Sequence, residues 1–206
     1  MAFKLIVVAT LEEMHDQIQH LPGLFDGGLP VLHLRTKSFS ENQFRKTLEA
    51  IPPIFHSRVV IHGYYELAFR FSLGGIHLTE NSKTLPSSDP IFKRLEHLPI
   101  SASFHSLEDL RSNTREFNYV FLSPVFDSIS KPAYKSEFNP AELRSFLSEF
   151  KSNSKTLIPV MSLGGINEKT VLLSKEMGFD GAVISGAIWK SKDPLKTLNK
   201  IQQVCL

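Results

Sequence analysis

The sequence predicts a single α/β domain over residues 1–206 that folds as a (β/α)8 barrel, or TIM barrel. Three observations predict this fold. Aliphatic runs alternate with stretches of helical spacing, the runs number eight, and each unit has about 26 residues, near the lower limit for such barrels. An open doubly wound sheet uses the same alternation and is the alternative fold. No G-x-G-x-x-G motif follows the first run, which favours the barrel.

Each expected strand is a short run of aliphatic or β-branched residues. The runs recur at fairly even spacing, over Lys4–Thr10, Leu29–Arg35, Arg58–His62, Gly74–Leu78, Ile100–Phe104, Tyr119–Ser123, Leu157–Ser162 and Gly181–Ser185. Between most of them, apolar residues repeat at helical spacing, as in Leu143, Phe146, Leu147 and Phe150. The repeating unit is therefore a strand followed by a helix.

Capping residues mark the starts of four expected helices. Ser40 and Ser106 precede acidic residues of a first turn, while Asn139 and Asp193 each precede a proline at the first helical position. The weakest expected helix is the fourth, around Pro90–His97. Capping side chains therefore predict where several of the helices begin.

The composition is that of an ordinary globular protein, with 42% hydrophobic residues, 21% charged residues and a net charge of +2. This balance argues against a broad electrostatic surface for nucleic acid, so an anionic ligand must be bound locally. Cys205 is the only cysteine, and no apolar run approaches the roughly 18 residues of a membrane span. We expect a soluble, cytoplasmic protein without nucleic-acid or membrane partners, and the pattern leaves a homo-oligomer open.

Glycines follow the last two expected strands. Gly164 and Gly165 come after the seventh strand, and Ser185 with Gly186 comes after the eighth, each before a helix. Bare backbone lets a ligand approach, and the first N–H groups of a helix attract an anion. A glycine pair alone also makes a tight turn. Two such elements on adjacent strands, where barrels commonly bind phosphate, predict a phosphate site.

Three basic side chains alternate along the second expected strand and its exit. His33, Arg35 and Lys37 are spaced two apart, so the strand period points them into the barrel and its mouth. We expect all three to bind substrate. The alternative is a structural ion pair of Arg35 with a barrel carboxylate, and it is weakened because few acidic residues lie near other strand ends.

Histidines lie at the ends of four expected strands. Ser103 and His105 are two apart at the end of the fifth, so we expect Ser103 to bind substrate. Imidazole suits proton transfer, which makes His105 the candidate catalytic residue. A satisfied structural histidine is the alternative. His62 and His77 end the third and fourth strands, and the four histidines at four strand ends, His33 and His105 included, raise a metal cluster as an alternative. Without an H-x-H pair or a strand-end aspartate, we expect no metal and interpret His62 as substrate-binding.

Two irregular stretches, Asn81–Asp89 and Asp127–Phe138, are expected to form loops over a site. In the second, Ser128 and Ser130 alternate and Lys131 follows. These hydroxyls and the single positive charge can bind several oxygens of an anionic group, so we expect them to contact substrate. A solvated serine-rich loop is the alternative.

In this order, the elements resemble the thiamine phosphate synthase family, including its thiazole tautomerase (TenI) branch. The resemblance runs from Leu5 to about Thr197, essentially the whole chain. Its motifs are L-R-T-K at Leu34–Lys37, G-I-H-L at Gly75–Leu78, S-F-H-S at Ser103–Ser106, the segment Tyr119–Phe126, S-I-S-K at Ser128–Lys131, L-G-G-I at Leu163–Ile166 and the segment Gly181–Ser185. By this resemblance, the S-I-S-K segment corresponds to a diphosphate-binding loop and the last two motifs to the phosphate grip.

For a synthase, the resemblance implies Mg²⁺-assisted attack of a thiazole phosphate nitrogen on the pyrimidine methyl cation that forms as diphosphate leaves. This sequence departs from that pattern. The family's Asn-Asp after the third strand reads His62–Gly63 here, and the aspartate expected soon after His77–Leu78 is missing. Because both metal-bearing carboxylates are absent, we expect no cofactor. Mg²⁺ is expected to bind only if the protein is a synthase.

The tautomerase branch also lacks the first aspartate, tends to have histidine at the position of His33, and transfers the proton with the histidine of S-x-H-S. His105 fits that branch, whereas Ser128, Ser130 and Lys131 keep the hydroxyls and charge of the synthases' diphosphate loop. We expect an enzyme that binds a phosphorylated thiazole and isomerises thiazole carboxylate phosphate through His105. The alternatives are a thiamine phosphate synthase that couples pyrimidine diphosphate to thiazole phosphate, and a non-catalytic barrel that binds thiazole phosphate.

Overall fold

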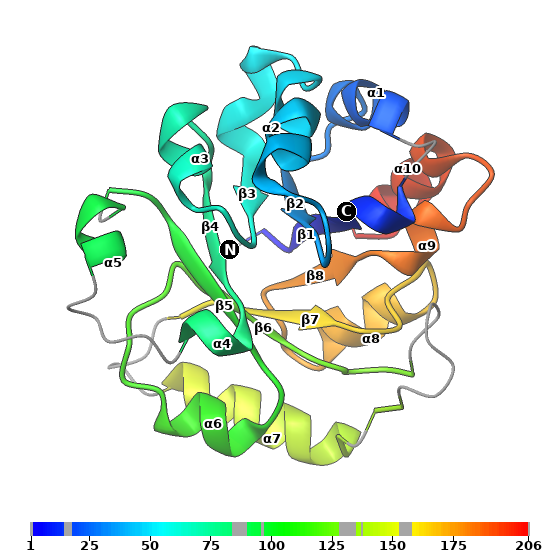
Figure 1. Cartoon of the computed structure of the whole chain (residues 1–206). Helices are drawn as coiled ribbons and strands as arrows, with labels where there is room; N and C mark the ends of the chain where they lie inside the picture. The colour runs from blue at the N-terminus through cyan, green and yellow to red at the C-terminus, as the bar shows by residue number, and fades with distance from the viewer. Residues whose placement is uncertain are drawn as a thin grey trace.

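A computed structural model shows eight parallel strands that close into a barrel in chain order, with helices around them (Figure 1). The first and last strands pair, Lys4 opposite Gly181 and Val7 opposite Ile184, which closes the sheet. The predicted TIM barrel is confirmed. The structure describes residues 2–14, 18–83, 90–95, 97–127, 135–136, 138–152 and 158–205, and the extent of one domain over 1–206 stays a prediction.

The strands lie close to the expected ranges. They are β1 (Lys4–Thr10), β2 (Val31–Arg35), β3 (Val59–Ile61), β4 (Gly75–Leu78), β5 (Ile100–Phe104), β6 (Tyr119–Leu122), β7 (Val160–Leu163) and β8 (Gly181–Ile184). Because helices cover one face of each strand and the barrel interior covers the other, most strand residues are buried. Continuous aliphatic runs follow from this two-sided burial.

Short helices connect the strands and pack on the outside of the barrel. The α-helices are α1 (Leu21–Asp26), α2 (Glu41–Glu49), α3 (Glu66–Arg70), α4 (Glu80–Lys83), α5 (Pro90–Arg94), α6 (Leu107–Ser112), α7 (Pro140–Ser152), α8 (Thr170–Glu176), α9 (Gly186–Trp189) and α10 (Pro194–Cys205). Three 3₁₀ helices complete the described elements: η1 (Leu11–Glu13), η2 (Ile18–His20) and η3 (Pro53–Arg58). The expected weak fourth helix around Pro90–His97 is α5, whereas α4 begins the stretch Asn81–Asp89 that was expected to be a loop.

The capping residues begin helices as expected. Ser40 forms a capping box with Gln43 at the start of α2, and the Ser106 hydroxyl accepts the backbone N–H of Asp109 in α6. The side-chain oxygens of Asn139 and Asp193 accept N–H groups in the first turns of α7 and α10. These caps fix where the chain turns from each loop into a helix.

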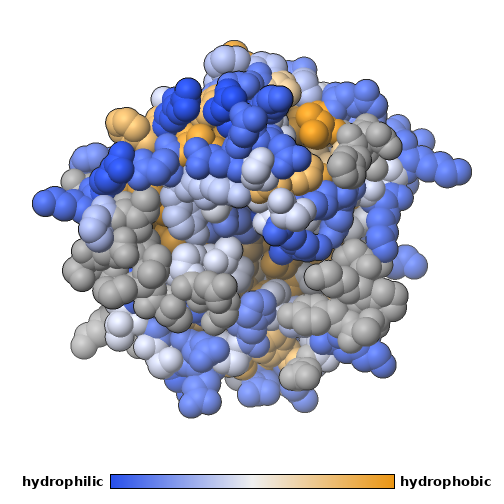
Figure 2. All heavy atoms as spheres, viewed as in Figure 1, coloured by the Kyte–Doolittle hydropathy of each residue, from blue (hydrophilic) through white to orange (hydrophobic). Residues whose placement is uncertain are grey.

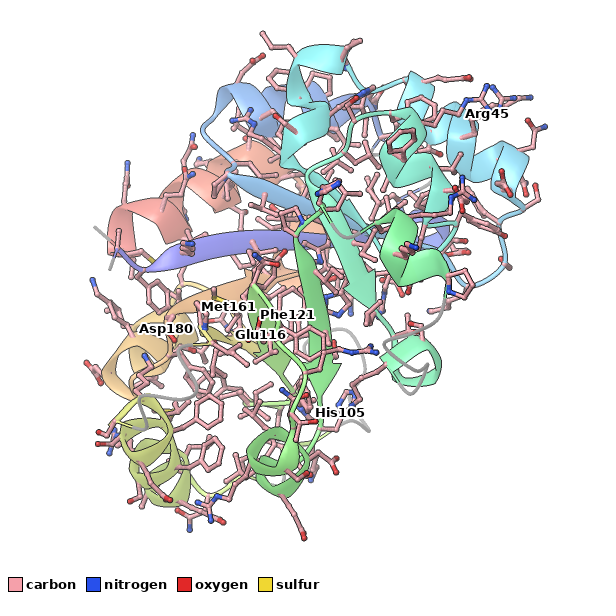
Figure 3. The ribbon with its side chains drawn as sticks, turned by 90° about the vertical axis from the view of Figure 1, so that its left-hand side faces the viewer. Arg45, His105, Glu116, Phe121, Met161 and Asp180 are labelled. Atoms are coloured by element: carbon pink, nitrogen blue, oxygen red, sulfur yellow. The ribbon has the colours of Figure 1, made fainter. Side chains whose placement is uncertain are left out.

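Two apolar cores hold the barrel together. The larger lies between the strands and the helices, and the smaller fills the barrel interior with Ile6, Val8, Phe121, Met161 and Val183. Figure 3 labels Phe121 and Met161 on neighbouring strands β6 and β7. The interior is therefore a packed core with apolar side chains at its base, as in other barrels of this size.

Trp189 in α9 joins the last unit of the barrel to the first strand. Its indole Nε1 donates a hydrogen bond to the carbonyl oxygen of Val8 at 2.6 Å, and both residues are buried. An indole N–H in a protein interior needs such an acceptor. This contact and the pairing of β1 with β8 close the barrel.

The face seen in Figure 2 is mainly hydrophilic over the outer helices, with separate hydrophobic patches. Exposed large apolar side chains such as Ile54 and Phe69 come from different elements. Cys205 is half-buried and free, and burial raises the pKa of its thiol. Among the described residues, no helix has the length and hydropathy needed to cross a membrane.

Candidate functional site

Three histidines from adjacent strands meet inside the barrel. His33 lies on β2, His62 directly follows β3, and His77 lies on β4. Nδ1 of His33 is 2.9 Å from Nε2 of His62, and the rings of His62 and His77 stack with their centroids 4.1 Å apart. Ring nitrogens of all three lie within 4.8 Å of one another. We call these three residues the histidine cluster.

Hydroxyl groups from β5 and β6 hold the rings of the histidine cluster. Nε2 of His33 is 2.6 Å from the Tyr119 hydroxyl, and Nδ1 of His77 is 2.8 Å from the Ser101 hydroxyl. Ser101 also donates to a backbone carbonyl of β4 and hydrogen-bonds Tyr119, so it accepts the N–H of His77. Nε2 of His77 is left as an acceptor for the Ser103 hydroxyl at 2.9 Å.

Burial keeps the histidine cluster uncharged at neutral pH. Removal from water lowers the pKa of His33 and His62 well below the usual value of 6.5, and neighbouring imidazoles lower both further. Burial, with the Arg35 guanidinium as a smaller cause, lowers the pKa of His77 to about 3. Burial also raises the pKa of Tyr119 to about 12. The interior beside the apolar core is therefore polar and hydrogen-bonded, but neutral.

His105 lies apart from the histidine cluster, exposed just beyond β5 and near the start of α6 (Figure 3). Its Nδ1 is 3.0 Å from the backbone carbonyl oxygen of Ser123. A carbonyl only accepts hydrogen bonds, so Nδ1 carries the proton and Nε2 keeps its lone pair. This tautomer leaves Nε2 able to take a proton from a ligand at the barrel mouth. The described contacts join Ser103 to His77 rather than to His105.

The three basic residues expected to bind substrate lie on β2 and on the loop that follows it. His33 is buried, while Arg35 at the strand end donates from Nε to the Thr10 hydroxyl at 2.7 Å. Strand alternation stops at Arg35, and Lys37 lies on the following loop, where its amino group is 3.3 Å from the carboxylate of Glu13. Arg35 is therefore placed at the mouth, and a substrate-binding role for Lys37 stays a prediction.

Glu12 fixes the loop that carries Lys37. One of its carboxylate oxygens accepts the Thr36 hydroxyl at 2.6 Å and the backbone N–H groups of Lys37 and Ser38 at 2.7 and 2.8 Å. Desolvation raises the pKa of Glu12, but these hydrogen bonds outweigh it and lower the pKa from 4.5 to about 2. The loop after β2 is therefore held by a carboxylate from the loop after β1.

The glycines after β7 make a close approach to the segment after β6. Gly164 and Gly165 have φ angles of +100° and +64°, and a Cβ on Gly165 would lie 2.4 Å from the backbone oxygen of Asp127. Ser185 and Gly186 follow β8, which pairs with β7, so the two glycine elements lie at neighbouring strand ends. Backbone geometry thus requires the glycines, and phosphate binding by these four residues stays a prediction.

A family model described as thiamine monophosphate synthase matches residues 5–188. The chain belongs to this thiamine monophosphate synthase/TenI family. The resemblance drawn from the sequence motifs is thereby confirmed. Family membership does not assign the roles of individual residues, so the site residues stay predictions.

Two curated relatives are about a quarter identical in sequence to this chain. A thiamine-phosphate synthase of Prochlorococcus marinus is 27% identical over 81% of the chain, and the match spans only 47% of that longer protein. One from Syntrophomonas wolfei is 25% identical over 86% of the chain and 83% of the relative.

Two solved structures have the same fold. A thiamine phosphate pyrophosphorylase from Bacteroides thetaiotaomicron is 30% identical, with a TM-score of 0.78 over 98% of this chain and 97% of that one. One from Pyrococcus furiosus, at 19% identity and a TM-score of 0.79 over 98% of this chain and 95% of that one, shows the fold alone.

The family's Mg²⁺ does not fit the donors that the described residues offer at the ends of β3 and β4. His62 and Gly63 follow β3, and Thr79 follows β4. Mg²⁺ favours carboxylate and other oxygen ligands, whereas this part of the barrel presents mainly imidazole nitrogens. The side chain of Glu80 and the predicted loop residues Ser128, Ser130 and Lys131 lie outside the described residues.

Three polar contributors to the site were not predicted from the sequence. Tyr119 and Ser101 hold the histidine cluster, and the amino group of Lys83 lies 3.2 Å from the carbonyl oxygen of Ser103. Lys83 also lies 4.3 Å from the centre of the Phe104 ring. Strand alternation gives a signal for Ser101 and Tyr119, because both share the inward face with Ser103 and Phe121 on their strands. No comparable local signal marks Lys83.

Proposed function

We propose that this family member joins a phosphorylated thiazole to a pyrimidine that carries a diphosphate leaving group, forming thiamine phosphate. The observation that carries this proposal is the 30% identity, over nearly the full length of both chains, to a structure named thiamine phosphate pyrophosphorylase. The curated relatives described above are also named thiamine-phosphate synthase. These names favour coupling over the isomerisation that the sequence motifs alone favour.

In the coupling, the thiazole nitrogen forms a bond to the methylene carbon of the pyrimidine. The bond from that carbon to the diphosphate oxygen breaks, and its electron pair leaves with the diphosphate. Because the histidine cluster is neutral, it does not repel positive charge that develops on a nearby pyrimidine. The Arg35 guanidinium at the mouth attracts the anionic groups of both substrates.

Phosphate anchoring supports either reaction of a phosphorylated thiazole. The backbone after β8 passes directly into α9, whose first N–H groups lack partners within the helix. After β7, the glycines precede a turn in which Asn167 Oδ1 already accepts the N–H groups of Lys169 and Thr170 at the start of α8. Ser185 begins α9 and makes no capping hydrogen bond with its side chain. We propose that Gly164, Gly165, Ser185 and Gly186 hold the thiazole phosphate and so fix the position of the ring at the mouth.

Isomerisation of thiazole carboxylate phosphate is the second candidate, and the tautomer of His105 favours it. With its Nδ1 proton donated to the Ser123 carbonyl, the imidazole can remove a proton at Nε2 and return it to another ring position. This reaction needs no leaving group and no metal. It therefore suits a site whose described strand ends lack the carboxylates of a Mg²⁺ site.

Two parallel assays separate the candidates. The full chain is given pyrimidine diphosphate and thiazole phosphate with Mg²⁺, or thiazole carboxylate phosphate alone, and each product is followed by chromatography. Coupling predicts thiamine phosphate in the first assay at ordinary enzyme rates of about 1 s⁻¹ or more. Product in the second assay only would overturn the coupling proposal and support isomerisation.

Variants test the role of His105 in both assays. His105→Asn should slow isomerisation about 10²–10⁴-fold, while coupling, which moves no proton, should change little. His20→Asn, at an exposed histidine in η2, is the matched control and should change neither rate. Ligand binding without turnover in either assay would support the third possibility, a barrel that only binds thiazole phosphate.

A further inference from the structure

We propose that His33, His62 and His77 bind one divalent transition-metal ion of the Zn²⁺, Co²⁺ or Ni²⁺ class inside the barrel. Three imidazoles from three adjacent strands converge there, and their nitrogens lie within 4.8 Å of one another. Three histidine ligands with a fourth position left open form a known type of catalytic zinc site. The proposal does not depend on which reaction the protein catalyses.

To bind one such ion, the ring nitrogens that lie up to 4.8 Å apart must approach each other by about 1.5 Å. Nitrogens that bind Zn²⁺ at about 2.0–2.1 Å in tetrahedral geometry lie roughly 3.3 Å apart. Nδ1 of His33 and Nε2 of His62 are already 2.9 Å apart, because a hydrogen bond joins them. An ion between them replaces that hydrogen bond, and the proton moves to the outer nitrogen of His62.

The outer hydrogen bonds of the rings match those of metal-binding histidines. A ligating imidazole usually donates its second N–H to an oxygen, which fixes its tautomer and orientation. Ser101 accepts the Nδ1 proton of His77, so the lone pair of that ring is on Nε2, where an ion would replace the Ser103 hydroxyl at 2.9 Å. Tyr119 lies 2.6 Å from Nε2 of His33, so when it accepts that proton Nδ1 faces His62 as a ligand. Each of the two rings therefore keeps one nitrogen whose lone pair can bind an ion.

The ligand atoms and charges of the histidine cluster determine which metal ion it can bind and which further ligand that ion needs. Nitrogen ligands favour borderline metals such as Zn²⁺ and Co²⁺ and disfavour Mg²⁺, which requires oxygen ligands. The three histidines carry no negative charge, and the Arg35 guanidinium interacts with His62 and His77. A bound ion therefore needs an anion in its open position. We expect inorganic phosphate in the buffer to strengthen metal binding.

The test uses chelator-treated full-length protein titrated with Co²⁺, Zn²⁺ or Mg²⁺. We expect one Co²⁺ per chain, measured by elemental analysis after desalting, and the visible absorption of four-coordinate Co²⁺. Zn²⁺ should displace Co²⁺ and raise the unfolding temperature, while Mg²⁺ should do neither. Absence of a cobalt spectrum at saturating ion would overturn the proposal.

Three variants localise the site. His62→Asn removes a ligand and should abolish the cobalt spectrum, and circular dichroism checks that the variant is folded. Tyr119→Phe keeps all three ligands but removes the oxygen beside His33, so metal affinity should fall about 10–100-fold. His20→Asn, at an exposed histidine of η2 outside the cluster, should bind Co²⁺ like the parent. Metal binding that survives in His62→Asn, or is lost in His20→Asn, would place the ion elsewhere and refute the assignment.

Discussion

The Glu12 carboxylate should stabilise the fold in a pH-dependent way, which Glu12→Gln tests. Its hydrogen bonds to the loop after β2 lower its pKa from 4.5 to about 2 despite the opposing effect of desolvation. A group whose pKa is lower in the folded state adds stability above its unfolded pKa. That stability is lost as the pH falls from the unfolded pKa toward the folded one. Here the loss falls between 4.5 and about 2.

The size of the effect follows from the two pKa values. A difference of about 2.5 units corresponds to about 3.4 kcal/mol of unfolding free energy at neutral pH. Glu12 is partly exposed, and solvent screens its charge, so we expect about half of this, or ~1.5 kcal/mol. At a pH of about 3.5, roughly two fifths of the contribution should be gone, because the folded carboxylate still resists protonation there.

Urea unfolding of the parent and of Glu12→Gln at several pH values between about 7 and 3.5 measures this difference. All other titrating groups contribute to both proteins and cancel in the comparison. Glu13→Gln is the matched control, because Glu13 pairs with Lys37 at 3.3 Å while 41% exposed, and such a pair is worth less than about 1 kcal/mol. A difference between the parent and Glu12→Gln that stays constant with pH would refute the reasoning.

Further changes test the backbone, a helix start and the buried network through urea unfolding. Gly165→Ala should cost more than about 2 kcal/mol, because φ is +64° and the new Cβ would meet the Asp127 oxygen, whereas Gly23→Ala meets nothing within 4 Å and should change stability by less than about 1 kcal/mol. Ser40→Ala removes a capping box and should cost about 1 kcal/mol, and no loss would show that the cap contributes nothing. Tyr119→Phe should cost about 1–3 kcal/mol by removing a hydrogen-bond partner of a buried imidazole, and an unchanged midpoint would contradict that bond.

The strands could be predicted from sequence because each is buried on both faces. A run such as Leu5–Ala9 is apolar without interruption, and such a run can be recognised in the sequence without knowledge of the tertiary structure. The helix starts at Ser40 and Ser106 were predictable for a related reason, since a cap involves residues three apart in sequence. Strand order also follows, because each strand pairs with the next along the chain.

The site was predictable only where it depends on the strand period. That period placed His33 inside the barrel, but it stops at Arg35, and Lys37 lies beyond the strand with its amino group beside Glu13. The hydrogen bond between His33 and Tyr119 joins residues 86 apart, and no local pattern specifies such a pair. Likewise, the requirement for glycine at 165 comes from the backbone at Asp127 on a neighbouring loop.

Barrel closure between β1 and β8 has a consequence for the chain as it is being made. β1 ends at Thr10 and its partner begins at Gly181, so about 170 residues are synthesised between them, which takes roughly 9–35 s at usual translation rates. During that time the apolar first strand has an unpaired edge, which favours pairing with other nascent chains. Trp189, which bonds to Val8, emerges later still. Release of a chain that ends before β8 should therefore yield an aggregation-prone fragment, and the nascent protein depends on protection of its first strand until its last unit arrives.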